Sequence, residues 1–240
     1  MKARLVDLGD AALTLEFGEE IDSGLNDQVM AARDALLAAP PSGITDVVPA
    51  YASLTVHFDP LRTDRDLVAT ALREAAATGK AVESTARQWW LPVHFGGEFG
   101  PDLAEAAAAT GRSEAEIVTA LCDVELRVFL IGFLPGFPYM GLLPEWLSLP
   151  RRATPRTAVP ANSVAIAGRQ AAVYPWQSPG GWHLLGRTPV PLFDLHAGDR
   201  PSLLAAGDRV RFRAVDASEF NRLEAGIAQG NLDRYRWLTP

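Results

Sequence analysis

The sequence predicts an α+β protein in two parts, a small layer of strands and helices followed by a barrel or sandwich of short strands. In the first third of the chain, strand and helix patterns follow the order ββαββα, which is typical of helices on one face of a sheet. Further along, short apolar runs are separated by Gly and Pro, and ten of the 18 prolines lie between Pro135 and Pro191. Regularly spaced short strands favour a barrel or sandwich. The 240 residues suffice for two domains, which we place at residues 1–84 and 85–240.

The first part is expected to contain four strands and two helices. The strands are predicted at residues 3–9, 12–17, 44–51 and 53–58, and the helices at residues 25–39 and 63–78. Gly9-Asp10 is a hairpin-type turn signal between the first two strands, and Pro40-Pro41 ends the first helix. Residues 79–85 are predicted to form a linker.

The second part is expected to begin with a strand, continue with two helices and then become rich in strands. Strands are predicted at residues 87–95, 125–132, 163–168, 171–175, 182–186 and 209–215, and helices at residues 103–110, 113–124 and 216–230. Ser113 and Glu116 form a capping-box pattern, and Asp216 with Glu219 gives a similar start to the last helix.

The decapeptide GFLPGFPYMG, residues 132–141, has neither helical nor strand periodicity and carries no charge. Glycine permits unusual backbone angles and proline fixes them, so we expect a stiff loop that leaves a strand. Its aromatic side chains suit a pocket wall or a protein interface. We assign the role of pocket wall or interface to four residues of this segment, Phe133, Pro135, Phe137 and Tyr139, and to Trp182 further along the chain.

Composition excludes several function classes. The net charge of −7 argues against a general nucleic-acid binder, and no apolar run is long enough for a membrane span. The N-terminus meets acidic residues at once and so lacks a signal-peptide pattern. With Cys122 as its single cysteine, the chain forms no internal disulfide. We therefore expect a cytoplasmic protein without nucleic-acid or membrane partners.

The charge is unevenly distributed along the chain. Residues 128–191 contain one acidic residue, Glu145, no lysine and five arginines: Arg151, Arg152, Arg156, Arg169 and Arg187. The planar guanidinium suits carboxylate or phosphate, so a small anionic ligand or an acidic partner surface is predicted here. The alternative is that these arginines bind carbonyls and carboxylates within the fold.

The common catalytic motifs are absent. The chain has no P-loop, no G-x-G-x-x-G or G-x-S-x-G, and no H-E-x-x-H or C-x-x-C pattern. Asp194 and His196 have a metal-ligand spacing that is common by chance, and no metal site is predicted. Ser163 or Ser178 could form a relay with His183 and Asp194, although any chain of this length offers such a set.

The chain nevertheless resembles a known family in five consecutive motifs. They are PVHFGGEFGPDL, IGFLPGFPYMGLLP, PRRATPRTAVPANSVAIAG, YPWQSPGGWHLLGRTP and PSLLAAGDRVRF. Their order and spacing are similar to those of the PxpB/KipI family, also called allophanate hydrolase subunit 1-like proteins. The resemblance implies a small ferredoxin-like α+β N-terminal domain and a cyclophilin-like β-barrel domain.

The same resemblance implies a function. It points to a subunit of ATP-dependent 5-oxoprolinase, which hydrolyses 5-oxo-L-proline to L-glutamate and is active in complex with a homologous PxpC-like barrel subunit and a PxpA-like subunit. ATP, with Mg, would be bound without a P-loop, by this chain or by a partner. The alternatives are a KipI-type inhibitor of a sensor histidine kinase and a subunit of an allophanate hydrolase or urea carboxylase-like system.

A lactam is a poor electrophile, and phosphorylation of its oxygen by ATP would make ring opening feasible. Such a site must hold a carboxylate and phosphates and exclude water. We assign Arg156 and Arg187 as anion contacts and Gly180 and Gly181 as amide donors to an oxyanion. His183 is the candidate proton-transfer group, with packing as the alternative role.

Asn162 and Ser163 complete the predicted substrate-binding set. The family commonly has Gly in place of Asn162, and Asn tolerates the left-handed backbone better than most residues. It commonly has His in place of Cys122 and Tyr in place of Leu126, exchanges for which we expect a packing reason.

Overall fold

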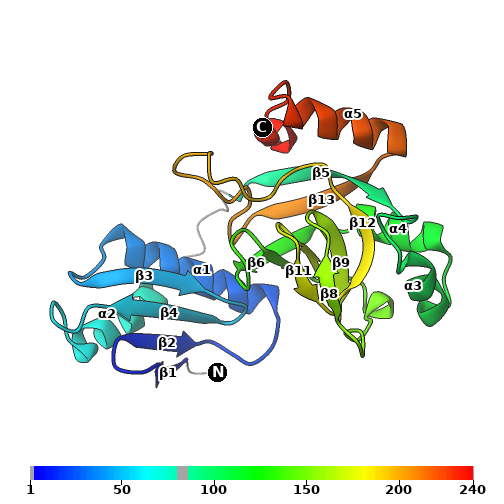
Figure 1. The fold of residues 1–240 in the computed structure, drawn as a ribbon. Helices are drawn as coiled ribbons and strands as arrows, with labels where there is room; N and C mark the ends of the chain where they lie inside the picture. The colour runs from blue at the N-terminus through cyan, green and yellow to red at the C-terminus, as the bar shows by residue number, and fades with distance from the viewer. Residues whose placement is uncertain (1–2, 80–85, 240) are drawn as a thin grey trace. The chain divides into compact units, whose positions relative to one another are not determined.

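The computed structural model describes residues 3–79 and 86–239, and the chain forms two compact units, Met1–Thr85 and Ala86–Pro240 (Figure 1). Apart from Gly79, the predicted linker at residues 79–85 lies outside the described residues. Each unit has its own hydrophobic core, so each is described by itself.

Unit 1 is a four-stranded antiparallel sheet with two helices. The strands are β1 (Arg4–Asp7), β2 (Ala12–Glu16), β3 (Ile44–Pro49) and β4 (Ser53–Phe58), and the helices are α1 (Ser23–Ala38) and α2 (Arg65–Thr78). The strand order is β1-β2-β4-β3. All six elements coincide with the predicted ones to within two residues at every end, which confirms the α+β layer.

The two faces of the unit 1 sheet differ in polarity because side chains alternate along each strand. Leu13 and Leu15 of β2 are buried with Leu54 and Val56 of β4 in a cluster that includes apolar residues of both helices. On the opposite face, the hydroxyl oxygens of the paired residues Thr14 and Thr55 lie 2.9 Å apart. The helices therefore cover one face of the sheet, as predicted.

Unit 2 is built around a closed barrel with the strand order β10-β7-β6-β13-β5-β12-β9. Its strands are β5 (Gln88–Phe95), β6 (Leu126–Ile131), β7 (Pro138–Gly141), β9 (Ser163–Ala167), β10 (Gln170–Val173), β12 (His183–Arg187) and β13 (Arg209–Ala214). Strands β8 (Arg156–Val159) and β11 (Ser178–Gly180) form a separate antiparallel pair. The short apolar runs predicted a barrel or a sandwich, and the structure shows the barrel, which confirms the cyclophilin-like domain that the resemblance implied.

Helices flank the barrel, as Figure 1 shows. They are α3 (Leu103–Thr110), α4 (Glu114–Asp123) and α5 (Ala217–Ala228), with short 3-10 helices η1 (Glu145–Leu147) and η2 (Arg234–Trp237). The capping box at the start of α4 is confirmed, since Ser113 N donates to Glu116 Oε2 at 2.8 Å and Glu116 N to Ser113 Oγ at 3.2 Å. Asp216 likewise accepts a hydrogen bond from Glu219 N at the start of α5.

The prediction of a loop over residues 132–141 is wrong for its last four residues. Residues 138–141 form β7, which pairs with β6 on one side and β10 on the other. Pro138 occupies the first strand position, where the missing backbone N–H is tolerated. Pairing with two neighbours overrides a local sequence that has little strand propensity. The β8–β11 pair lies in segments for which we predicted no strand either.

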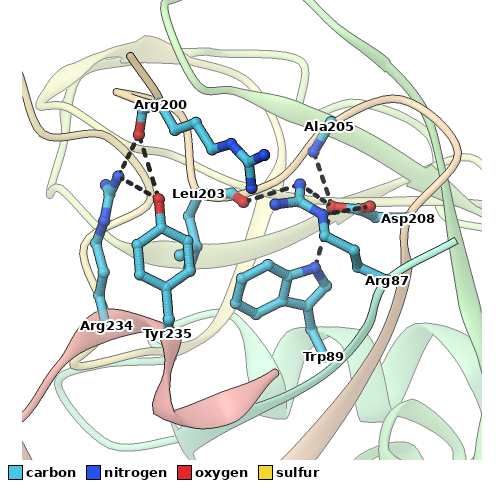
Figure 2. Close-up of polar contacts among 8 residues, drawn as sticks. All are labelled: Arg87, Trp89, Arg200, Leu203, Ala205, Asp208, Arg234 and Tyr235. Carbon is cyan, nitrogen blue, oxygen red and sulfur yellow. Dashed lines mark hydrogen bonds and ion pairs between the residues drawn. The ribbon is translucent and has the colours of Figure 1, made fainter. Parts of the chain in front are cut away.

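The barrel closes through strands from opposite ends of unit 2. β5 and β13 pair in parallel, Gln88 opposite Arg209 through Val93 opposite Ala214. Beside this seam, the buried Asp208 carboxylate accepts hydrogen bonds from Arg87 Nη2 at 2.7 Å, Trp89 Nε1 at 3.0 Å and Ala205 N at 2.9 Å (Figure 2). Asp208 therefore links β5 to the loop before β13.

The C-terminal segment is attached to the same region. The buried side chain of Arg234 in η2 donates to the carbonyl oxygens of Arg200 and Pro201 (the bond to Arg200 is drawn in Figure 2), and Thr239 N donates to Gln88 O at 2.7 Å. These contacts hold the end of the chain against β5 and the loop after β12.

Candidate functional site

Unit 2 contains a cleft of about 420 Å³ beside the β8–β11 pair. The loop after β5, strand β8 with the turn that follows it, and strands β9 and β12 line the cleft. The lining residues are Glu98, Phe99, Pro101, Arg156, Ala158, Pro160, Ser163, Leu184 and Arg187. Three residues assigned to anion binding from the sequence, Arg156, Ser163 and Arg187, thus lie in one cleft although they come from three different strands.

Arg156 is held by a buried carboxylate that sequence reasoning missed. Asp102 Oδ1 accepts from Arg156 Nη2 at 2.6 Å and from Arg152 Nη1 at 3.0 Å, and its Oδ2 accepts from Leu184 N at 2.7 Å. Asp102 is 3% exposed, and its side chain makes no capping bond to α3, which it precedes. It therefore connects the start of α3 to β8 and β12.

The surroundings of Asp102 favour its ionised form. Burial alone raises the pKa of a carboxyl group, but here the hydrogen bond from Arg156, the Leu184 backbone N–H and the two nearby guanidinium charges outweigh it and lower the pKa of Asp102 below its ordinary value. Asp102 is therefore a carboxylate at neutral pH and a fixed anchor for Arg156. The arginine-rich composition of residues 128–191 indicated a carboxylate partner without identifying it.

Arg187 is held differently. Its guanidinium carbon lies 5.6 Å from the centroid of the Phe99 ring, and its Nη2 is 3.9 Å from the half-exposed Glu224 carboxylate of α5. Neither contact is a strong hydrogen bond. Within the part of the chain that the structure describes, Arg187 Nε and Arg156 Nη1 are both buried and have no hydrogen-bond acceptor. Each arginine of the cleft therefore keeps at least one buried donor unused.

Asn162 and Ser163 lie at the turn between β8 and β9. Asn162 has a φ of 63°, in the left-handed region, so it takes the conformation that Gly would allow at this position. Its carbonyl oxygen accepts from Thr188 N at 3.0 Å. Ser163 Oγ donates to Pro160 O at 2.8 Å, which leaves the hydroxyl oxygen free to accept.

Gly180 and Gly181 are not among the residues that line the cleft. A Cβ atom on Gly180 would lie 2.3 Å from the hydroxyl oxygen of Tyr174, whereas one on Gly181 would meet nothing closer than 3.5 Å. Gly181 O accepts from Arg152 N at 2.7 Å. The structure thus gives Gly180 a packing reason, and the amide-donor role of both residues stays a prediction.

His183 is 7% exposed and also lies outside the cleft lining. Its Nε2 is 2.9 Å from Pro150 O, so Nε2 carries the hydrogen, and its buried Nδ1 finds no partner among residues 3–79 and 86–239. The candidate relay is not formed in this structure. Ser163 donates to Pro160 O, Asp194 accepts from the backbone N–H of His196, and Ser178 Oγ has no hydrogen-bond partner within those ranges. Proton transfer by His183 stays a prediction.

The five predicted wall residues divide into exposed and buried ones. Phe133 is 63% exposed and Pro135 is exposed, whereas Phe137 and Trp182 are buried and Tyr139 is half-buried. We call Phe133, Phe137, Tyr139, Tyr174 and Trp182 the aromatic cluster. Its ring centroids lie 4.9 Å apart for Phe137 and Tyr139 and 5.1 Å for Phe137 and Tyr174. Burial raises the pKa of Tyr174 to about 12.

The two family departures in the first half of unit 2 have packing surroundings. Leu126 is fully buried in the barrel core, where its apolar side chain fits. Cys122 of α4 is half-buried against the same core, and burial raises the pKa of its thiol. Both positions are therefore part of the packing of α4 and β6 rather than of the cleft.

Two further findings concern the described ranges as a whole. Among residues 3–79 and 86–239 there is no group of three or more His, Cys, Asp or Glu side chains that could hold a metal ion. None of the described helices has the length and apolar character that crossing a bilayer requires.

This barrel, with its small preceding unit, belongs to the family described as carboxyltransferase domain, subdomain C and D, whose model matches residues 3–204. Within the family, the chain is 36% identical over 235 residues to the B subunit of 5-oxoprolinase from Bacillus subtilis, covering 92% of this chain and 96% of that protein. It is 40% identical to the corresponding 5-oxoprolinase protein of Escherichia coli O157:H7, covering 88% and 95%. The resemblance to the PxpB/KipI family is confirmed.

A solved structure supports the fold. The crystal structure of TTHA0988 is 39% identical in sequence and has a TM-score of 0.76, with 86% of this chain and 40% of that chain covered. This chain therefore spans about two fifths of TTHA0988.

Proposed function

We propose that this chain is one component of an ATP-dependent 5-oxoprolinase, which hydrolyses 5-oxo-L-proline to L-glutamate. The observation that carries this function is the 36% identity, across 96% of its length, to a protein named as one of the subunits of 5-oxoprolinase. That name supports an enzyme of several chains. The partners proposed from the resemblance are a homologous PxpC-like barrel subunit and a PxpA-like subunit, in the cytoplasm, with activity in the complex alone.

The cleft supports this function chemically. The substrate is a small cyclic amide that carries one carboxylate, and the cleft combines two guanidinium groups with a hydroxyl oxygen and apolar side chains. Arg156 and Arg187 bind and orient the carboxylate in this scheme, and Phe99 and Leu184 exclude water from the ring. ATP, when bound, supplies the activation of the lactam oxygen; the roles of His183, Gly180 and Gly181 in that step are part of the proposal.

The test is reconstitution. The full chain is combined with its candidate PxpC-like and PxpA-like partners, and glutamate release from 5-oxoproline and ATP is measured with each protein omitted in turn. We expect release from the complete mixture and none when this chain is left out. Release that does not depend on this chain contradicts the function, as does turnover of urea or allophanate in place of 5-oxoproline. Suppression of histidine kinase autophosphorylation without turnover would favour the KipI-type alternative.

A further inference from the structure

We propose that the cleft lined by Arg156 and Arg187 binds a single carboxylate group and rejects polyphosphates. This chain would then hold the carboxylate end of a small substrate, while a triphosphate is bound on another surface or by a partner chain. The identity of the ligand, 5-oxo-L-proline, rests on the function proposed above. The preference for one carboxylate over a polyphosphate rests on the residues of the cleft.

The unused donors match one carboxylate. Arg156 Nη1 and Arg187 Nε are buried and lack an acceptor within the described ranges. A buried donor without an acceptor is destabilising, so such groups in a native structure point to a ligand or an ordered water. A carboxylate has two oxygens and binds guanidinium N–H groups with charge-assisted hydrogen bonds. In the proposed site, one carboxylate bound between these two lining residues would accept from both arginines.

Both guanidinium groups have contacts before a ligand arrives, a short ion pair for Arg156 and weaker contacts for Arg187. Asp102, itself 3% exposed, holds Arg156 at 2.6 Å, and the ring of Phe99 lies under Arg187. Because these contacts use the other parts of each side chain, binding would cost little side-chain ordering. Asp102 thereby acts as a positioning residue for Arg156.

The charge around the cleft disfavours a polyphosphate. Three guanidinium groups and four carboxylates lie in or directly behind it: Arg152, Arg156 and Arg187, and Glu98, Asp102, Glu105 and Glu224. The formal sum is −1, so a ligand with several negative charges would enter a region without net positive charge. A monocarboxylate carries one negative charge, so hydrogen bonds from the two arginines are enough to bind it without a net positive charge around the cleft.

The lining also lacks the parts that cradle phosphates. Phosphate sites use arginine, lysine, glycine-rich backbone amides or helix N-termini, and of the residues that supply these groups the cleft lining has two arginines but no lysine and no glycine. Pro101 and Pro160 contribute no backbone N–H at all. Apart from its two arginines, the lining offers no positively charged side chain to a triphosphate.

The hydroxyl of Ser163 adds a second element of selectivity. Its hydrogen is donated to Pro160 O at 2.8 Å, so the oxygen of this lining residue can act only as an acceptor toward a ligand. An acceptor suits the N–H of a lactam ring and repels a phosphate oxygen. With Phe99, Ala158 and Leu184 as apolar wall, the cleft matches a small ring that bears one carboxylate and one N–H.

The experiment measures binding to the purified full chain by titration calorimetry. The probes are 5-oxo-L-proline, its uncharged analogue 5-oxo-L-prolinamide, inorganic tripolyphosphate and ATP with Mg²⁺. We expect 5-oxoproline to bind at concentrations up to about 1 mM, in the ordinary range of substrate affinities, and the amide to bind at least about tenfold more weakly. Tripolyphosphate and ATP should leave the affinity for 5-oxoproline unchanged.

Two variants and one control locate the site. Arg187→Gln and Arg156→Gln should each weaken 5-oxoproline binding by about tenfold or more. Arg222→Gln removes an arginine of the same unit that is 68% exposed and should have no effect. Tryptophan fluorescence checks folding, because all six tryptophans lie in unit 2.

Three outcomes overturn the site: no binding of 5-oxoproline, competition by tripolyphosphate that Arg187→Gln abolishes, or equal binding of the acid and the amide. These outcomes are separable from failure of the proposed function, since binding by the chain alone needs no turnover. If the chain binds 5-oxoproline but supports no glutamate release, the proposed site stands and the proposed function is wrong. If it supports glutamate release but does not bind 5-oxoproline, the function stands and the site is wrong.

Discussion

Asp102 Oδ1 lies 2.6 Å from Nη2 of Arg156, although the two residues are 54 positions apart in the sequence. The carboxylate also binds Arg152 and the backbone of Leu184. One buried side chain thus joins α3, β8 and β12 at the back of the cleft. The stability of unit 2 and the position of Arg156 are therefore coupled.

The first prediction follows from this coupling. Asp102→Asn removes the carboxylate and leaves two guanidinium groups without their shared anion. Removing one partner of a buried ion pair lowers the free energy of unfolding by about 3–5 kcal/mol. Because Arg152 and Arg156 are partly accessible to water, we expect a loss near the lower end of that range. Urea unfolding followed by tryptophan fluorescence measures it in unit 2. Glu105→Gln, at a carboxylate that also binds Arg152 but is 56% exposed, is the control and should cost less than about 1 kcal/mol.

The second prediction concerns pH. Because the pKa of Asp102 is lowered in the folded state, the unfolded chain binds the proton more tightly. The contribution of Asp102 to stability is then complete above its unfolded pKa of about 4 and is lost as the pH falls through the lower folded value. The free energy of unfolding should fall with acidification below about pH 4, and less steeply in Asp102→Asn. Parallel curves for the two proteins would show that Asp102 is not the titrating group.

The third prediction compares two adjacent glycines. Gly180→Ala places a methyl group 2.3 Å from the hydroxyl oxygen of Tyr174, which is 1% exposed and packed against Phe137. We expect a loss of about 1–3 kcal/mol in the free energy of unfolding, as for other overpacked sites. Gly181→Ala has room for the methyl group and should change stability by less than about 0.5 kcal/mol. Equal effects of the two substitutions would contradict the packing reason for Gly180.

The fourth prediction tests the left-handed turn. Asn162→Gly should be nearly neutral, because Gly adopts a φ of 63° without strain. Asn162→Val should destabilise unit 2 by about 1–2 kcal/mol or more, because a β-branched residue is strained there. Thermal unfolding monitored by fluorescence distinguishes the two. A valine variant as stable as the glycine variant would show that the turn relaxes.

The fifth prediction separates interface from core within the aromatic cluster. Phe137→Ser empties a site that is 1% exposed and should cost about 3–5 kcal/mol, by analogy with Phe→Ala in cores. Phe133→Ser, at a residue 63% exposed, should change stability by less than about 0.5 kcal/mol. If Phe133 contacts a partner protein, the serine variant weakens co-purification while its unfolding curve stays unchanged. Unfolding of the Phe133 variant would instead assign that ring to the core.

The sequence predicted the elements whose signals are local. The capping box of Ser113 and Glu116 needs residues three positions apart, and both hydrogen bonds are present. The alternation along β2 and β4 likewise depends on neighbours in the chain, and it places the unit 1 core correctly. Strand β7 could not be found this way, because its stability comes from pairing with β6 and β10 rather than from its own residues.

The site was predictable in kind rather than in detail. The excess of arginine between residues 128 and 191 pointed to anion chemistry, and Arg156 and Arg187 do line one cleft. Asp102 was missed because its partners lie some 50 to 80 positions away and nothing in its own neighbourhood marks it as buried. The close approach of Gly180 to Tyr174 is equally a property of the folded chain.

The parallel pairing of β5 with β13 has a consequence for how the protein is made. Arg87 and Asp208, which meet beside that seam, are 121 positions apart, so the last barrel strand leaves the ribosome long after the first. Until then β5 and β6 each lack one neighbour, and unpaired strand edges invite aggregation. The described elements of unit 1 are complete by Thr78, so this unit can fold during translation. The barrel cannot close until β13 has been synthesised. The nascent second unit is therefore the species that most needs chaperones.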